Sequence, residues 1–380
     1  MRIAIVDSFR FKGWYTWDLS RELGRLIGGN LFLYAPKGVK DGHRDRPYVF
    51  RGIWSPMFYP FQIVKQARRD GVNILHVQFE FHTFGSFYTS FLVALLLLFA
   101  RVMGIKVVST LHGPVFPRNP PGELFEAIRP RGIRAPAGLI RLYIVLVYRI
   151  IHALSDRIVV HADVFRRWLG EYGMSNCCAI PHGVRSVEWA AGADGGKVIL
   201  YFGVLSPRKG VEYLVEAFAR LNRSDVGLVL AGMEPWYYRG YADRIRGLIR
   251  GLGLEGRVRL TGYVREEDVP KLFHGSTVAV FPHLFSVSAS GALALALAYR
   301  KPVVATATEY ATELLGGVED LPLVPPRDSL RLAEAIAGLL DDDDLRGRVS
   351  EGLAGIADRH SWRRVAGRTL EVYRALSRGP

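Results

Sequence analysis

The stretch from Lys197 to Leu221 restricts the possible folds of this chain more than any other segment. Residues 198–202 are apolar and predict a buried strand, which a short turn follows. Beyond the basic pair Arg208-Lys209, apolar residues recur at three- and four-residue steps, which predicts a helix. A helix start leaves backbone N–H groups without partners and carries partial positive charge, so an anion can bind there. The two cations strengthen this expectation, although both can equally be solvated residues of a surface helix.

Length and composition indicate a folded protein with room for two domains. The chain has 380 residues, of which 49% are hydrophobic and 23% charged, and this balance excludes a disordered chain. Its two cysteines, Cys177 and Cys178, are adjacent, which disfavours a structural disulfide and indicates a reducing, cytoplasmic setting. The start, MRIAIVDS, lacks the apolar core of a signal peptide and instead predicts a first strand.

Positive charge is concentrated in the first half. Residues 1–185 contain 25 Lys and Arg against 12 Asp and Glu, which accounts for +13 of the net charge of +14. Such asymmetry predicts an anionic partner for the first half: a membrane surface, a lipid phosphate or nucleic acid. Frequent use of arginine is the alternative, but it does not explain why the excess lies on one side.

Polar residues stand at the ends of the strands predicted in the first half. Gly13 lies in the loop after the strand predicted at 3–6, where it would let a ligand approach the backbone closely. His112 follows the strand predicted at 107–111, a position that faces the ligand crevice of a parallel sheet. A hydrogen-bonded loop histidine is the alternative.

Four more polar residues alternate along the strand predicted from Asn73. Extended chain would place them on one face. This pattern suggests a site, whereas a solvated edge or satisfied core hydrogen bonds would explain it without one. The residues are His76, Gln78, Glu80 and His82.

Two apolar segments lie in the basic half. Residues 81–100 contain no charged side chain, and residues 138–154 form an apolar helix that follows a loop rich in proline and arginine. Polar residues within the first segment argue against a membrane span. We expect these helices to contact an anionic bilayer surface, with two core helices as the alternative.

The segment 197–221 resembles G-R-L-x-x-x-K-G-x-x-x-L-I-x-A, which opens the second domain of family 4 glycosyltransferases of the GT-B fold. Lys209 and Gly210 match its Lys-Gly, where the family binds the diphosphate of a nucleotide-sugar donor. Val204 stands where many members carry the first Arg, and Arg208 can take over that charge.

The resemblance covers both halves of the chain. His112 lies in a Thr-x-His context that the family places beside the donor sugar and its leaving diphosphate. AIPHGV at 179–184 is similar to the family's I-P-N-G-V, with His182 in place of Asn. The segment from His360 resembles the C-terminal helix that crosses back to the first domain.

The resemblance implies two Rossmann-like, doubly wound α/β domains that face each other across a cleft. We expect an acceptor-binding domain at 1–185, a linker at 186–196, a nucleotide-sugar-binding domain at 197–358 and a crossover helix at 359–380. The implied reaction transfers a sugar from a nucleotide-diphosphate donor to a glycan, lipid or lipid-linked saccharide. The expected location is the cytoplasmic side of the membrane.

The resemblance also implies chemistry without a cofactor or a metal ion. No His and Cys cluster has metal-ligand spacing, and the acidic run at 341–344 is explained by favourable charge at a helix start.

The chain departs from the family at one motif. Most members carry two glutamates separated by seven residues, one for the donor sugar and one for the ribose, and their positions here are Val287 and Leu295. Neither side chain can accept a hydrogen bond from a hydroxyl. Hydroxyls and free N–H groups at residues 288–291 could bind phosphate or sugar in their place. The alternative is a degenerate domain, and without the glutamates the retaining outcome that the family implies stays open.

The predicted site falls into three groups of residues. The catalytic candidates are His112, Arg208 and Lys209. The donor-binding candidates are Gly13, Gly203, Gly210, Gly262, Tyr263, Ser288, Ala289, Ser290 and Gly291, and those of the acceptor side are Glu80 and His82.

Two other classes of protein remain as alternatives. Val287 and Leu295 are compatible with a non-catalytic protein that binds a nucleotide or a glycan. The basic composition is compatible with nucleic-acid binding, but no recognition module is present and we expect no nucleic-acid partner.

Overall fold

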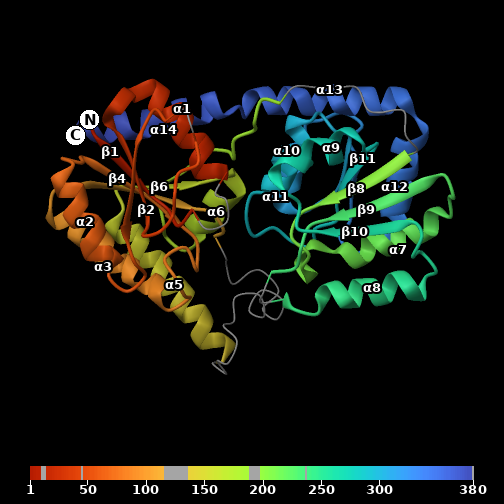
Figure 1. The fold of residues 1–380 in the computed structure, drawn as a ribbon, viewed down its shortest axis with the longest axis horizontal. Coiled ribbons are helices and arrows are strands. Elements are labelled where there is room, and N and C mark those ends of the chain that lie inside the picture. Colours follow the sequence, from red (N-terminus) through yellow and green to blue (C-terminus); the bar gives the residue numbers. More distant parts are fainter. Residues whose placement is uncertain (10–13, 44–45, 115–135, 188–196, 236–237, 379–380) are drawn as a thin grey trace.

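The computed structural model describes residues 1–9, 14–43, 46–114, 136–187, 197–235 and 238–378. They form two α/β domains side by side, each built around one parallel sheet (Figure 1). The predicted pair of doubly wound domains is therefore confirmed.

The first domain contains a seven-stranded parallel sheet in the order β3-β2-β1-β4-β5-β6-β7. Its strand order reverses between β1 and β4, which is where a ligand crevice opens in such sheets. The strands are β1 (Ile3–Val6), β2 (Leu31–Pro36), β3 (Val49–Trp54), β4 (Ile74–Phe79), β5 (Lys106–Leu111), β6 (Arg157–Val160) and β7 (Cys177–Ala179).

Helices cover both faces of this sheet because alternate strand residues point to opposite sides. Ala4 and Val6 belong to one apolar core, and Ile3 and Ile5 to another. The helices on the first side are α2 (Tyr59–Arg69), α3 (Val93–Val102) and α5 (Ala137–Leu154); the second side carries α1 (Trp14–Ile27) and the C-terminal α14 (Trp362–Ser377). The domain also contains α6 (Asp163–Glu171), η1 (Gly28–Asn30) and η2 (Thr89–Leu92).

One expectation about β4 is wrong. The strand ends at Phe79, and the chain turns before it reaches His82, whose backbone has a left-handed φ of 79°. Of the four alternating polar residues, only His76 and Gln78 lie within the strand and share a face. The apolar segment that follows is also helical over a shorter length than expected, because turns occupy residues 81–88.

The second domain contains a six-stranded parallel sheet in the order β10-β9-β8-β11-β12-β13. Here the order reverses between β8 and β11. The strands are β8 (Lys197–Phe202), β9 (Val226–Ala231), β10 (Val258–Gly262), β11 (Val278–Phe281), β12 (Val303–Thr306) and β13 (Leu323–Val324). Its helices are α7 (Val211–Leu221), α8 (Tyr241–Gly251), α9 (Val269–His274), α10 (Gly291–Ala298), α11 (Glu309–Leu315), α12 (Ser329–Asp341) and α13 (Asp343–Arg359), with η3 (Pro207–Lys209) and η5 (Glu266–Asp268).

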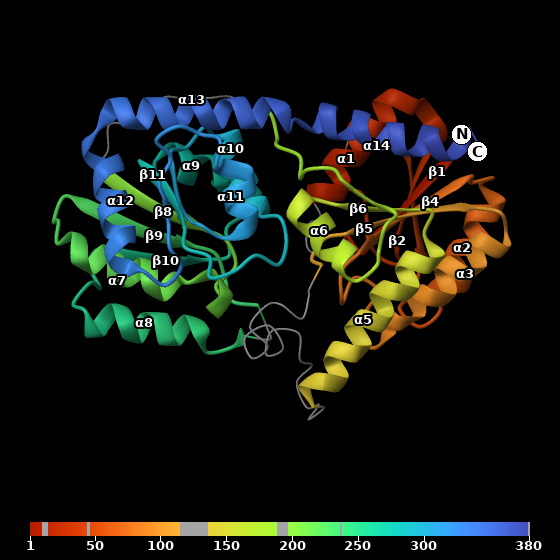
Figure 2. The same ribbon diagram turned by 180° about the vertical axis from the view of Figure 1, so that it is seen from behind.

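The chain returns to the first domain after α13. This helix lies along the second domain, and α14 continues beyond it to pack on α1 (Figures 1 and 2). At the junction Val184 donates a backbone hydrogen bond to His360, and the Trp362 ring packs so closely on Gly183 that a Cβ there would lie 2.1 Å from it. The crossover expected from the C-terminal segment is thus present.

Polar contacts join the domains at two further places. Arg185 donates from Nε to Asp18 on α1 at 2.6 Å and from Nη1 to Glu266 of the second domain at 2.8 Å. On the other side of the contact, the Glu313 carboxylate of α11 accepts the first two backbone N–H groups of α6, each at 2.6 Å. A carboxylate at a helix start is favourable because it offsets the unpaired N–H groups and the helix dipole.

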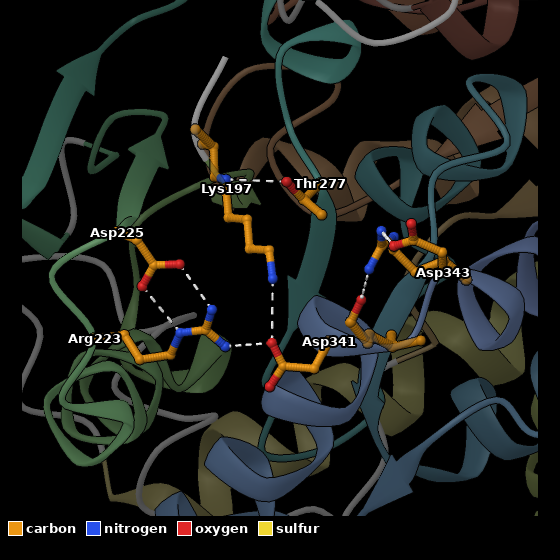
Figure 3. Close-up of polar contacts among 9 residues, drawn as sticks. Lys197, Arg223, Asp225, Thr277, Asp341 and Asp343 are labelled. Atoms are coloured by element: carbon orange, nitrogen blue, oxygen red, sulfur yellow. Dashed lines mark hydrogen bonds and ion pairs between the residues drawn. The ribbon is translucent and has the colours of Figure 1, made fainter. Parts of the chain in front are cut away.

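The acidic run at 341–344 has a structural role, as Figure 3 shows. Asp341 is the last residue of α12 and pairs with Lys197 and Arg223, so it does not precede a helix as expected. Asp342 accepts a hydrogen bond from the N–H of Leu345 and caps α13. Asp342, Asp343 and Asp344 therefore stand at the start of α13, as predicted, while Asp341 joins the end of α12 to the start of the central strand β8 and to the loop before β9.

Candidate active site

Several predicted residues come together where the strand order of each sheet reverses. Glu80 follows β4, His112 follows β5, and Arg208 and Lys209 follow β8. The domains meet at Gly113, where a Cβ would lie 3.7 Å from Glu80 Oε1, 3.5 Å from the carbonyl oxygen of residue 287 and 3.8 Å from the Cβ of residue 288. The carboxyl end of the first sheet therefore faces the segment that precedes α10.

A buried lysine occupies the second domain's side of this site. Lys209 is only 8% exposed, which excludes a solvated surface position, and its Nζ lies 3.0 Å from Nε2 of His283. Burial, and then the charge of Arg208, hold the pKa of Lys209 well below its usual value. Burial and the two neighbouring cations also lower the pKa of His283 well below the ordinary range. Among the described residues neither Arg208 nor Lys209 forms an ion pair, although the charge of Arg208 acts on the nearby Glu80 carboxylate.

Glycines allow the loops around the lysine to pack backbone against backbone. Gly210 has a φ of 61°, and a Cβ on it would lie 2.1 Å from the carbonyl oxygen of Pro282. A Cβ on Gly232 would lie 1.8 Å from the carbonyl oxygen of Gly203. Gly262 also has a positive φ, of 68°, and next to it Tyr263 is 56% exposed.

The segment before α10 contains no carboxylate. Val287 and Leu295 are 8% and 6% exposed, so both positions are apolar and buried. Ser290 caps α10 by accepting the N–H of Leu293 at 3.2 Å. Residues 288 and 289 are half-buried, and Gly291 is exposed, with the space for its Cβ 3.8 Å from Nε2 of His182.

His112 is held inside the first domain by two side chains. Its Nε2 lies 2.8 Å from Gln78 Oε1, and its Nδ1 lies 3.1 Å from Nε2 of His161. His161 in turn donates from Nδ1 to the carbonyl oxygen of Ile180 at 3.2 Å. Burial lowers the pKa of His112 to about 3, so the ring is neutral at pH 7. Because Gln78 Oε1 can only accept, the ring proton of neutral His112 is on Nε2. Its Nδ1 then faces an equally unprotonated Nε2 of His161, so this second contact is not a hydrogen bond while both rings are neutral.

The hydrogen-bonded chain continues to α14. His76 is 1% exposed and lies within bonding distance of Thr110 Oγ1 at 2.7 Å and of the Tyr373 hydroxyl at 2.5 Å. Gln78 joins it to His112. His76 is therefore a satisfied core residue.

Sequence reasoning did not select His161, although the signal was available. Like His112, it follows a buried strand at its carboxyl end. One other predicted residue is not brought to the site. His82 lies in the turn after β4, where its ring contacts Phe87 on the side of α3 and α5, and Gly13 is outside the described residues.

Two hollows lie between the domains. The larger, of about 680 Å³, lies beside the contact between α6 and α11. It is lined by residues of both domains, none of them a predicted site residue. A second of about 270 Å³ reaches His161. Within the described part of the chain, no group of three or more His, Cys, Asp or Glu side chains is arranged to hold a metal ion.

Comparison with known proteins identifies the family. One family model, described as Glycosyltransferase Family 4, matches residues 13–186, and a second, described as Glycosyl transferases group 1, matches residues 196–342. The chain belongs to the group 1, family 4 glycosyltransferases. The resemblance inferred from the residues around Lys209 is thereby confirmed.

Two curated relatives illustrate the similarity of this family 4 chain to characterised members. It is 30% identical over 188 residues to an alpha-D-kanosaminyltransferase of Streptomyces kanamyceticus, covering 49% of this chain and 47% of the relative. It is 31% identical over 233 residues to the phosphatidyl-myo-inositol mannosyltransferase of Mycobacterium leprae, covering 59% and 60%. The matched region thus spans about half to three fifths of these relatives.

Solved structures share the whole fold. Sucrose-phosphate synthase from Thermosynechococcus elongatus superposes with a TM-score of 0.76 at 18% identity, with all of both chains covered. HepE of Anabaena, solved in complex with UDP, superposes with a TM-score of 0.73 at 16% identity over 99% of this chain and 100% of its own. At these identities the similarity establishes the fold alone.

Proposed function

We propose that this protein transfers a sugar from a nucleotide-diphosphate donor bound to the second domain onto an acceptor held by the first. The observation that carries the proposal is the buried Lys209 beside Arg208 at the turn that enters α7, where within the described residues Lys209 has the neutral His283 and no carboxylate as a partner. A buried ammonium group without a partner is unfavourable, and a bound diphosphate would supply the missing anion. Family membership and the activities for which the relatives are named support the same reaction class.

The two cations would act mainly on the leaving group. Negative charge builds on the diphosphate as its bond to the sugar breaks, and Arg208 and Lys209 are in place before this happens. Preorganised charge of this kind is usually the largest contribution to catalysis. Neutral His112, whose orientation is set by Gln78 and His161, would form the opposite wall of the site beside the sugar.

Calorimetric titration of UDP, GDP and ADP into the wild type and Lys209→Ala tests the donor site. We expect one nucleotide to bind and Lys209→Ala to weaken it about ten- to a hundredfold, the range for a hydrogen bond to a charged group. Lys271→Ala is the matched control, since the Lys271 side chain is 82% exposed. Equal affinity in the wild type and Lys209→Ala would contradict the proposal.

Val287 and Leu295 favour a second candidate, a non-catalytic protein that binds nucleotide. Such a protein would bind a nucleotide at Lys209 but release no nucleoside diphosphate from any sugar donor. Measuring that release from UDP-, GDP- and ADP-sugars in the presence of membrane extract separates the two candidates, because turnover excludes the second.

We further propose that the first domain contacts an anionic bilayer, at the predicted cytoplasmic face. Large exposed apolar side chains gather on α2, α3 and α5, which pack side by side (Figure 1), and on the turns before them. Exposed basic residues stand on the same helices, which favours binding to anionic lipid. We call this the apolar–basic surface; its apolar residues are Met57, Phe58, Phe61, Tyr88, Phe91, Leu95, Leu98, Val102, Met103, Leu139, Leu142 and Leu146, and its basic residues are Lys65, Arg68, Arg69, Arg101, Arg141 and Arg149.

Co-sedimentation with vesicles of neutral and of anionic lipid tests this contact. We expect binding to the anionic vesicles and a loss of at least about tenfold in Leu142→Ser/Leu146→Ser, because two apolar side chains no longer leave water. Leu252→Ser/Leu330→Ser removes two exposed leucines of the second domain and should bind like the wild type. Absence of binding to anionic vesicles at low salt would refute the contact. No helix in the described ranges is long and apolar enough to cross a bilayer.

A further inference from the structure

The side chain of Glu80 is an unengaged carboxylate between the two domains. It follows β4 where the first strand order reverses, and it is exposed to solvent. Its backbone N–H donates to Thr83, but within the described residues its carboxylate forms neither a hydrogen bond nor an ion pair. Folding alone therefore gives no reason for a carboxylate at this position.

Glu80 faces the part of the second domain that lacks an acidic group. Its Oε1, the carbonyl oxygen of Val287 and the Cβ of Ser288 all lie within 4 Å of the point where a Cβ on Gly113 would stand. The sequence from 287 to 295, VSASGALAL, contains no carboxylate or carboxamide. A carboxylate that accepts from sugar hydroxyls at this place must therefore come from outside this segment.

The electrostatics of Glu80 tie it to the proposed diphosphate site. Loss of solvent at the domain contact raises the pKa of Glu80, whereas the positive charge of Arg208 lowers it. A diphosphate held by Arg208 and Lys209 would point its attached sugar into the space between these cations and the first domain. The hydroxyls of a neutral hexose are donors that a carboxylate can accept, two or more at a time.

We propose that Glu80 supplies, from the first domain, the carboxylate that binds the hydroxyls of the transferred sugar. This inference rests on the proposed glycosyl transfer. If Glu80 binds the sugar hydroxyls, it helps to determine which sugar is transferred. It would then supply, across the domain contact, the carboxylate that the segment 287–295 lacks.

Opposite shifts in two affinities test the assignment. Glu80→Gln and Glu80→Ala are titrated with UDP and UDP-glucose, or with GDP and GDP-mannose if the wild type prefers guanosine. We expect the sugar nucleotide to bind about ten- to a hundredfold more weakly. The nucleoside diphosphate should bind as tightly as before or a few-fold more tightly, because a like charge near the phosphates has been removed. A merely structural residue would move both affinities in the same direction.

Controls separate this inference from the proposed function. Glu22→Gln removes a half-buried carboxylate of α1 that pairs with Arg25, and it should change neither affinity. The melting temperature of Glu80→Ala should be close to that of the wild type, because within the described residues the carboxylate forms no hydrogen bond or ion pair that the change would remove. Wild-type sugar-nucleotide binding and transfer in Glu80→Ala, with intact nucleotide binding, would overturn the Glu80 assignment alone. A wild type that binds no nucleotide would overturn the proposed function, and the Glu80 assignment with it.

Discussion

Binding of the sugar nucleotide should draw a proton from solution onto Lys209. In the free protein the ammonium form is disfavoured, since Lys209 is buried beside Arg208. Its hydrogen-bond partner among the described residues is His283, an uncharged acceptor 3.0 Å away. A diphosphate next to Nζ favours the charged form and therefore raises the pKa of Lys209 on binding. At any pH between the free and the bound pKa, the complex holds more protons than the free protein.

The size and the sign of the effect follow from linkage. One group can take up at most one proton, so Kd should weaken by up to about tenfold, or about 1.4 kcal/mol, for each unit by which the pH rises through this window. Lys209→Met removes the titrating group and should make Kd nearly independent of pH. The variant should also bind about ten- to a hundredfold more weakly, because a charged hydrogen bond to the phosphate is lost.

Calorimetry in two buffers of different ionisation enthalpy measures the proton directly. The titrant is a sugar nucleotide, because its diester phosphates have no proton to exchange near neutral pH. We expect an uptake approaching one proton in the wild type and in Lys271→Met, and close to none in Lys209→Met. Equal uptake by the wild type and Lys209→Met would refute the reasoning and would assign the proton elsewhere, with His283→Gln as the variant to examine next.

Three further predictions concern the scaffold of the site. Glu313→Gln should lower the free energy of unfolding in urea by about 1 kcal/mol, because the start of α6 loses its charged acceptor; identical urea midpoints would contradict this. The pKa of His112 is about 3 in the folded protein and 6.5 when unfolded, so stability is lost as the pH falls below 6.5. Urea unfolding of His112→Gln should therefore show about 2 kcal/mol less loss than the wild type between pH 6.5 and pH 5. Gly210→Ala should lower Tm and abolish nucleotide binding, because its Cβ would overlap the Pro282 carbonyl at a positive φ; wild-type Tm and affinity would argue against that role.

Much of the fold could be predicted from local patterns. Strands β1 and β8 are continuous apolar runs because both their faces are buried in a parallel sheet. The helix that follows Lys209 has the period of a half-buried helix. The basic pair Arg208-Lys209 and the lack of a carboxylate at 287 and 295 could be predicted to matter from the sequence, because both concern residue types alone.

Local patterns failed where the chain stops being regular. The alternation from His76 to His82 suggested extended chain, but β4 ends at Phe79 and a turn carries His82 away from Glu80. Alternating polar residues cannot show where a strand ends, because the geometry of the turn depends on contacts with residues that are distant in the sequence.

Contacts between distant residues were decided by tertiary structure alone. The burial of Lys209, the partners of His112 and the approach of Glu80 to residue 288 each depend on how strands and domains pack. Periodicity records only whether a residue faces the core or the solvent, since it arises from neighbours along one helix or strand. The positions of charge and hydrogen-bond partners across the domain contact arise from pairings that no single segment contains.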